Sequence, residues 1–254
     1  MIKGINGKPI KINKKGIIYP VDVVLSSESG KDILTITSRI KFIPLVLSNE
    51  IDFEGWKLAV LNGMRDWSGD YLVFGNQPIR VNVNVTETKK KIDSIFVYCI
   101  DEEMRQYLVD VYGKYNLKKA EQMFSENRPC ASIGFLGLNW KSYLPRFIYL
   151  FYSTLDDFDY AQRVAKHEFG HVLGIGDLYR DLEKGLPGVD GLEYEDLKPY
   201  FQGNYSFDAV MCNNGPVRDN DIEMLLLAFQ TNKFQNYQKI RAKDKISEAL
   251  GIGN

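Results

Sequence analysis

The chain contains only two histidines, and they lie four residues apart in the segment His167-Glu168-Phe169-Gly170-His171. Four residues advance an α-helix by about 400°, so both imidazoles would leave one face of a helix, one turn apart. Two ring nitrogens placed in this way can reach one zinc ion at about 2.0–2.1 Å. Glu168 can then face a water molecule in the open position of the metal without being a ligand itself. The spacing predicts a zinc site with His167 and His171 as ligands and Glu168 as the general base of a hydrolytic reaction.

A catalytic zinc ion needs a third protein ligand, and the chain has no third histidine. Gly174 ends the helical pattern and lets the chain reverse sharply, because glycine adopts a positive φ without steric cost. Asp177 follows three residues later, and a carboxylate oxygen binds zinc at about 2.0–2.2 Å. We therefore predict Asp177 as the third ligand and water as the fourth. Cys212 and the acidic residues between 181 and 208 are the alternatives for the third position.

The two histidines need a rigid helix, and the sequence predicts one over residues 156–173. Asp156 or Asp157 can cap its first turn, and Gly174 and Gly176 stand beyond its end. Apolar residues recur at helical spacing between these limits, at Tyr160, Ala161, Val164, Ala165 and Val172.

Strands and further helices are expected around this helix. A helix with Asp52 as its N-cap is predicted from Phe53 to Trp67, and its apolar residues recur every three or four positions. Further helices are predicted over 101–124 with a break near Gly113, over 219–230 and over 235–250. Core strands are predicted over 39–47, 79–85, 94–100, 131–136 and 146–153. This order predicts the α+β class, with a twisted mixed sheet of five strands and helices on one face.

Composition and charge exclude some classes of binding partner. Its 254 residues carry 32 Lys and Arg against 33 Asp and Glu, a net charge of −1, which argues against nucleic acid and against a polybasic membrane contact. The longest apolar runs have six residues, whereas a membrane-spanning helix needs about 20. Three cysteines do not suggest a disulfide framework. We expect a monomer that is cytoplasmic as the sequence is written, and secreted if a leader has been removed.

The string from His167 to Asp177 resembles the metzincin zinc endopeptidases. An aspartate at the third ligand position is similar to the snapalysin branch of small secreted bacterial proteases. Met211, within residues 209–216, resembles the methionine in the tight turn that lies beneath the metal in this family. Asn213 stands where some metzincins have a tyrosine that touches the metal, so that contact is not expected here.

The resemblance implies a zincin catalytic domain with one catalytic zinc ion and a cleft between two parts. A polypeptide substrate would bind extended and add to an edge strand near Gly134, Phe135 and Leu136. The pocket wall beside the metal would be formed by Asn213, Asn214 and Gly215.

The same reading divides the chain into three parts. Residues 1–36 would form a β-like extension, 37–231 the metzincin-like catalytic domain, and 232–254 a C-terminal helix. Within the catalytic domain the upper part would end near 176, and the lower, mostly helical part would occupy 177–231.

Two alternatives to a general endopeptidase stay open at this stage. The protein could be an amidase-like enzyme with a single dedicated substrate, or it could use a zinc-bearing fold for binding without catalysis. Acidic residues between 177 and 196 could in principle hold calcium, but their spacing fits no EF-hand, and a solvated loop is expected instead.

Overall fold

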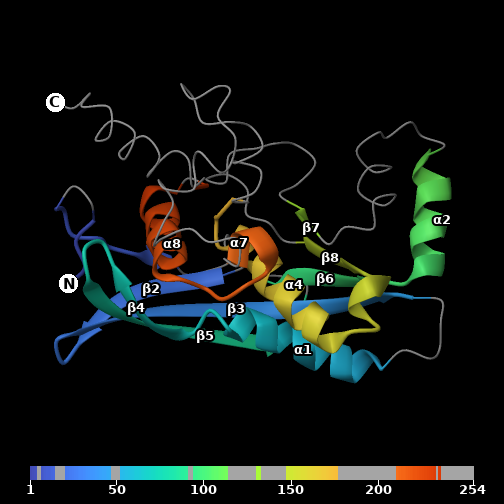
Figure 1. Cartoon of the computed structure of the whole chain (residues 1–254), viewed down its shortest axis with the longest axis horizontal. Helices are drawn as coiled ribbons and strands as arrows, with labels where there is room; N and C mark the ends of the chain where they lie inside the picture. Colours follow the sequence, from blue (N-terminus) through green and yellow to red (C-terminus); the bar gives the residue numbers. More distant parts are fainter. Residues whose placement is uncertain are drawn as a thin grey trace.

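A mixed β-sheet forms the centre of the computed structural model (Figure 1), which describes residues 1–4, 7–14, 21–46, 52–90, 94–113, 130–132, 147–176, 210–232 and 234–235. Its strands are β1 (Asn13–Lys14), β2 (Val21–Glu28), β3 (Lys31–Leu45), β4 (Gly69–Val73), β5 (Gln77–Glu87), β6 (Ile95–Ile100), β7 (Cys130–Ser132) and β8 (Phe147–Phe151). The helices are α1 (Phe53–Arg65), α2 (Glu102–Gly113), α4 (Phe158–Val172), α7 (Val210–Asn213) and α8 (Asp219–Thr231), with a short 3₁₀ turn η1 (Tyr152–Thr154).

The long strand β3 organises the sheet. Its first half pairs antiparallel with β2, its second half pairs parallel with β6, and β5 pairs parallel along its other edge. The strand order across the sheet is β1-β2-β3-β6-β8-β7, and β4 extends the opposite edge by pairing with β5. The expectation of a mixed sheet is therefore confirmed.

The predicted number of strands was wrong. The described residues form eight strands rather than five, because β1, β2 and β4 also pair into the sheet. β4 escaped prediction since its five residues alternate between exposed and half-buried positions until Val73. The boundary predicted between residues 36 and 37 lies inside β3, since every second side chain of that strand is buried from Asp32 to Phe42.

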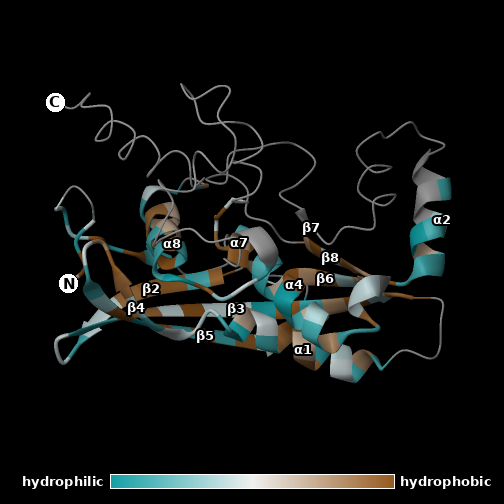
Figure 2. Ribbon diagram, in the orientation of Figure 1, coloured by the Kyte–Doolittle hydropathy of each residue, from teal (hydrophilic) through white to brown (hydrophobic). Residues whose placement is uncertain are grey.

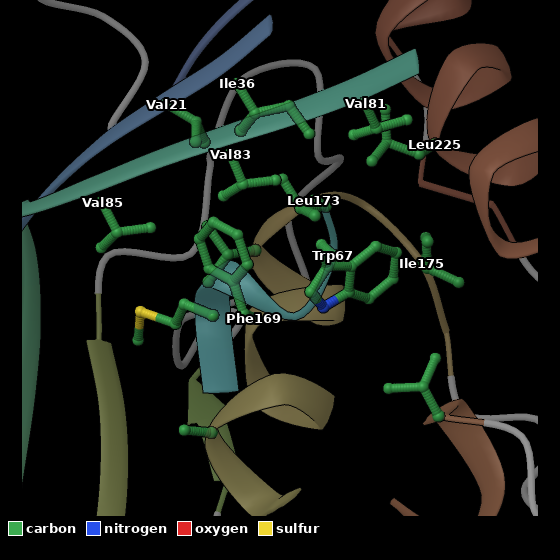
Figure 3. Close-up of a cluster of buried hydrophobic side chains, with 14 of the residues drawn as sticks. Val21, Ile36, Trp67, Val81, Val83, Val85, Phe169, Leu173, Ile175 and Leu225 are labelled. Carbon is green, nitrogen blue, oxygen red and sulfur yellow. The ribbon is translucent and has the colours of Figure 1, made fainter. Parts of the chain in front are cut away.

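Helices α1 and α4 pack against each other and against one face of the sheet (Figure 1). Both begin at the predicted caps: Asp52 accepts a hydrogen bond from the Gly55 amide at 2.9 Å, and Asp157 accepts one from the Tyr160 amide at 2.8 Å. A cluster of buried side chains fills the space between the helices and the sheet (Figure 3). It contains Phe169 of α4, the next residues Leu173 and Ile175, and the buried side chains of β5.

Helix α8 covers the outer edge of β4. The Leu72 amide donates to the Asp219 carboxylate at 2.9 Å, and the Phe74 amide donates to the Glu223 carboxylate at 2.8 Å. Two carboxylates one helical turn apart thus satisfy one backbone donor of the edge strand β4 and one in the turn that follows it, in a position where edge strands otherwise expose unpaired amides. This contact fixes α8, and with it the short segment back to α7.

Helix α2 stands at the end of the long axis opposite the N-terminus (Figure 1). Its first turns are hydrophilic, whereas strands β6 and β8 beside it are largely hydrophobic (Figure 2). The predicted helix over 101–124 is confirmed up to Gly113, while the rest of it and the predicted helix over 235–250 lie outside the described residues, apart from Gln235. None of the helices in the described ranges has the length and apolar character needed to cross a bilayer.

Candidate metal centre

Helix α4 brings His167, Glu168 and His171 together in its last turns. The three residues are only 6%, 4% and 7% exposed. One potential ligand atom from each side chain lies within 4.8 Å of the other two, and the imidazole centroids are 5.0 Å apart with their planes at 88°. Such a buried group could hold a metal ion.

The ring of His167 is oriented by a residue 43 positions later in the chain. Its Nδ1 lies 2.8 Å from the backbone oxygen of Val210, the first residue of α7. A carbonyl oxygen only accepts hydrogen bonds, so Nδ1 must carry the proton, and the neutral ring has its lone pair on Nε2. Anchoring of one ring nitrogen in this way is typical of histidines that bind metal through the other.

The ring of His171 is oriented by the turn that ends its own helix. Gly174 adopts φ 89°, its amide donates to the His171 oxygen at 3.0 Å, and the Ile175 amide donates to the Gly170 oxygen at 3.1 Å. This pair of bonds is a Schellman motif, in which a glycine in the left-handed region reverses the chain. The reversal brings the Ile175 oxygen to 2.8 Å from His171 Nδ1, so this ring too has its lone pair on Nε2.

Glu168 lies between the two histidines in sequence and is the least exposed of the three residues. A buried carboxylate is costly unless positive charge or hydrogen-bond donors surround it. A divalent cation bound by the two imidazoles would supply that charge. The donor set of two imidazole nitrogens with an adjacent carboxylate therefore fits zinc better than magnesium or calcium, which prefer oxygen ligands.

Met211 packs against the backbone of α4. A Cβ atom built on Gly170 would lie 2.4 Å from Met211 Sδ and 2.9 Å from Trp67 Cζ2. The fully buried methionine therefore packs directly against the helix backbone, one residue before His171. Only glycine leaves room for that contact.

Trp67 supports the same stretch of α4 from the side of the sheet. Its indole Nε1 donates to the Lys166 oxygen at 2.9 Å. The Tyr71 hydroxyl donates in turn to the Trp67 oxygen at 3.2 Å. Burial, with smaller contributions from the charges of Asp221 and Asp219, raises the pKa of Tyr71, so the phenol stays protonated and able to donate.

The other predicted site residues are placed only in part. Asn214, with φ 56°, and Gly215 are half-buried and directly follow Asn213 at the end of α7. Asp177 lies outside the described residues, as do Gly134, Phe135, Leu136 and the acidic stretch 177–196. The third ligand, the substrate edge and the absence of a calcium site thus stay predictions.

Sequence reasoning missed the two carbonyl groups that orient the histidines. Val210 and Ile175 act through their backbones, and no side-chain pattern marks such a role. Gly170 did carry a signal, because a glycine inside a helix costs about 1 kcal/mol and so indicates close packing.

Neither a protein-family model, nor a curated protein, nor a solved structure matches the chain. The function is therefore argued from the site itself. The described residues provide a buried His-Glu-His group, a carbonyl anchor for each imidazole, and a methionine packed against the helix backbone.

Proposed function

We propose that the protein is a zinc-dependent, metzincin-like endopeptidase. His167, His171 and Asp177 would hold the metal, and Glu168 would be the general base. One observation carries the proposal: both buried imidazoles have Nδ1 tied to a backbone oxygen at 2.8 Å, which leaves the Nε2 lone pairs as ligand atoms beside the Glu168 carboxylate.

The chemistry follows from these residues. Zinc, when bound, polarises a scissile carbonyl group and lowers the pKa of a water molecule towards about 7. The Glu168 carboxylate would accept a proton from the attacking water and then give it to the leaving amine. Because α4 is packed on two sides, Glu168 would be held in place without a large rearrangement during the reaction.

The sheet offers a place for an extended substrate. Among the described strands, β7 is the last in the order, and it pairs antiparallel with β8. Ala131 and Ser132, the first two residues of the strand predicted over 131–136, lie in β7. We propose that the main chain of a polypeptide binds along the outer edge of β7.

The test is digestion of a proteome-derived peptide library by the zinc-loaded full chain, with new termini read by mass spectrometry. Glu168→Gln should retain one zinc ion per chain and lose nearly all cleavage. Glu103→Gln, at an exposed position of α2, is the matched control and should cleave like the wild type. Cleavage by Glu168→Gln would refute the general base. No cleavage by zinc-bound wild type would refute a general endopeptidase and favour a dedicated substrate or a binding role.

A further inference from the structure

The turn after α4 is held by a segment from the end of the described chain. The Gly176 amide donates to the Gln235 oxygen at 2.8 Å, and the Gln235 amide donates to the Gly174 oxygen at 2.8 Å. Gln235 and Ile175 thereby form a parallel β-bridge. The bridge lies four residues beyond the end of α8, whose C-cap Asn232 adopts φ 53° and redirects the chain.

This bridge acts on the same peptide unit that orients His171. The carbonyl group of Ile175 and the amide group of Gly176 belong to one planar peptide unit. Its oxygen accepts the His171 Nδ1 proton, and its N–H donates to Gln235. Hydrogen bonds linked in this way polarise one another, so the bond to Gln235 makes the Ile175 oxygen a better acceptor. A better acceptor at Nδ1 raises the basicity of the imidazole at Nε2.

We infer that Gln235 is a positioning residue of the metal centre, acting through its backbone and through the 175–176 peptide unit on His171. The inference rests on the proposed role of His171 as a metal ligand. It assigns a function to the segment after α8, to which sequence reasoning gave none. The orientation of both imidazoles then depends on residues after position 209. Val210 orients His167 directly, and Gln235 acts on His171 through one peptide unit.

Burial supports a positioning role. Ile175 is fully buried, so water does not compete for its oxygen as it would at the surface. Phe234, next to Gln235, packs against the main hydrophobic core and holds the segment in register. The half-buried side chain of Gln235 donates from Nε2 to Thr231 Oγ1 at 3.3 Å, whereas backbone groups make both hydrogen bonds of the bridge.

The test compares two substitutions at position 235 in the full chain. Gln235→Pro removes the amide that donates to Gly174, which is one of the two hydrogen bonds that hold the Gln235 oxygen at the Gly176 amide, whereas Gln235→Ala keeps both backbone groups and is the matched control. Zinc affinity is measured by competition with a chromophoric chelator, on protein whose circular dichroism shows that it is folded. We expect Gln235→Pro to bind zinc about tenfold more weakly, with a changed Co²⁺ absorption spectrum, and Gln235→Ala to match the wild type. Equal affinity and equal spectra for all three proteins would overturn the inference.

A measurement on the wild type keeps the inference testable if Gln235→Pro does not fold. Coupling between two sites is reciprocal, so zinc must also strengthen the bridge. Zinc loading should slow hydrogen exchange of the Gly176 and Gln235 amides, and unchanged exchange at one bound zinc per chain would refute the coupling. The outcome is separate from that of the proposed function: zinc binding without peptide cleavage refutes only the peptidase, whereas a wild type that binds no zinc overturns both.

Discussion

Helix α4 is held on two sides, and the two sides are built differently. Towards α1, a Cβ atom on Gly63 would lie 2.1 Å from the Gln162 backbone oxygen, so two helix backbones are in contact. Towards α7, a Cβ atom on Gly170 would lie 2.4 Å from the Met211 sulfur, so a backbone meets a flexible side chain. The first contact fixes where the helix lies. The second lies next to His171, and the α7 segment that provides Met211 also orients His167.

The comparison suggests that the two sides of α4 have different roles. The α1 side is a contact between backbones and provides neither imidazole anchor, and we expect it to determine stability. The α7 side combines Met211 with the Val210 oxygen, and we expect changes there to alter metal binding as well as stability. Three substitutions test this division.

The largest loss of stability is expected for Gly63→Ala. The new methyl group would meet the backbone of Gln162 and the Lys166 amide nitrogen, which lies 3.1 Å away, so the two helices must separate. We expect the free energy of unfolding to fall by about 3 kcal/mol in urea denaturation. Gly30→Ala is the control, because nothing lies within 4 Å of its Cβ position and only its φ of +81° is unfavourable, at a cost of about 1 kcal/mol. Equal losses for the two variants would show that the helix contact is not tight.

A loss of about 2 kcal/mol is expected for Trp67→Phe, because a buried ring shrinks and the hydrogen bond to the Lys166 oxygen disappears. Trp56→Phe is a matched control, since Trp56 is also fully buried and its indole donates to Thr154 rather than to α4. Both variants should lose similar stability in urea denaturation. Only Trp67→Phe should also weaken zinc binding, because Trp67 contacts α4 at Gly170. Weaker zinc binding in both would show that the effect does not depend on the contact at Gly170.

A smaller loss, of about 1.5 kcal/mol, is expected for Gly170→Ala, because the thioether at 2.4 Å can move away in part and alanine gains helix propensity, so that the main remaining conflict is with Trp67 Cζ2 at 2.9 Å. Unlike the loss in Gly63→Ala, this loss of stability should become smaller when Met211 is also substituted. In a double-mutant cycle with Met211→Ala, the unfolding free energies should be non-additive by about 1 kcal/mol in the favourable direction. The corresponding cycle of Gly63→Ala with Gln162→Ala should be additive, since the conflicting atoms belong to the backbone. Additivity in both cycles would remove the contrast.

The sequence predicted the parts of this arrangement that depend on side-chain spacing. Helices α1 and α4, with Asp52 and Asp157 as caps, follow from apolar periodicity and from the capping chemistry of aspartate. The His167 and His171 pair follows from the helical repeat. β4 could not be predicted, because its pairing depends on β5 and α8 rather than on an apolar pattern.

The anchors of the two imidazoles lay beyond sequence reasoning for a physical reason. Every residue carries a backbone oxygen, so only the folded chain selects Val210 and Ile175. The bridge to Gln235 depends likewise on how α8 ends and on how the chain returns to Gly174. Asp177 stays the predicted third ligand, on the sequence argument alone.

The central claim is that His167 and His171 bind one zinc ion, and X-ray absorption on the untagged, zinc-loaded full chain tests it most directly. The chain has only two histidines, so any imidazole scattering must come from this pair. We predict one zinc ion per chain with two imidazole nitrogens at about 2.0–2.1 Å. The variant that combines His167→Ala with His171→Ala should lose both the bound zinc and the imidazole scattering. Zinc bound without imidazole scattering, or no zinc bound at all, would contradict the account.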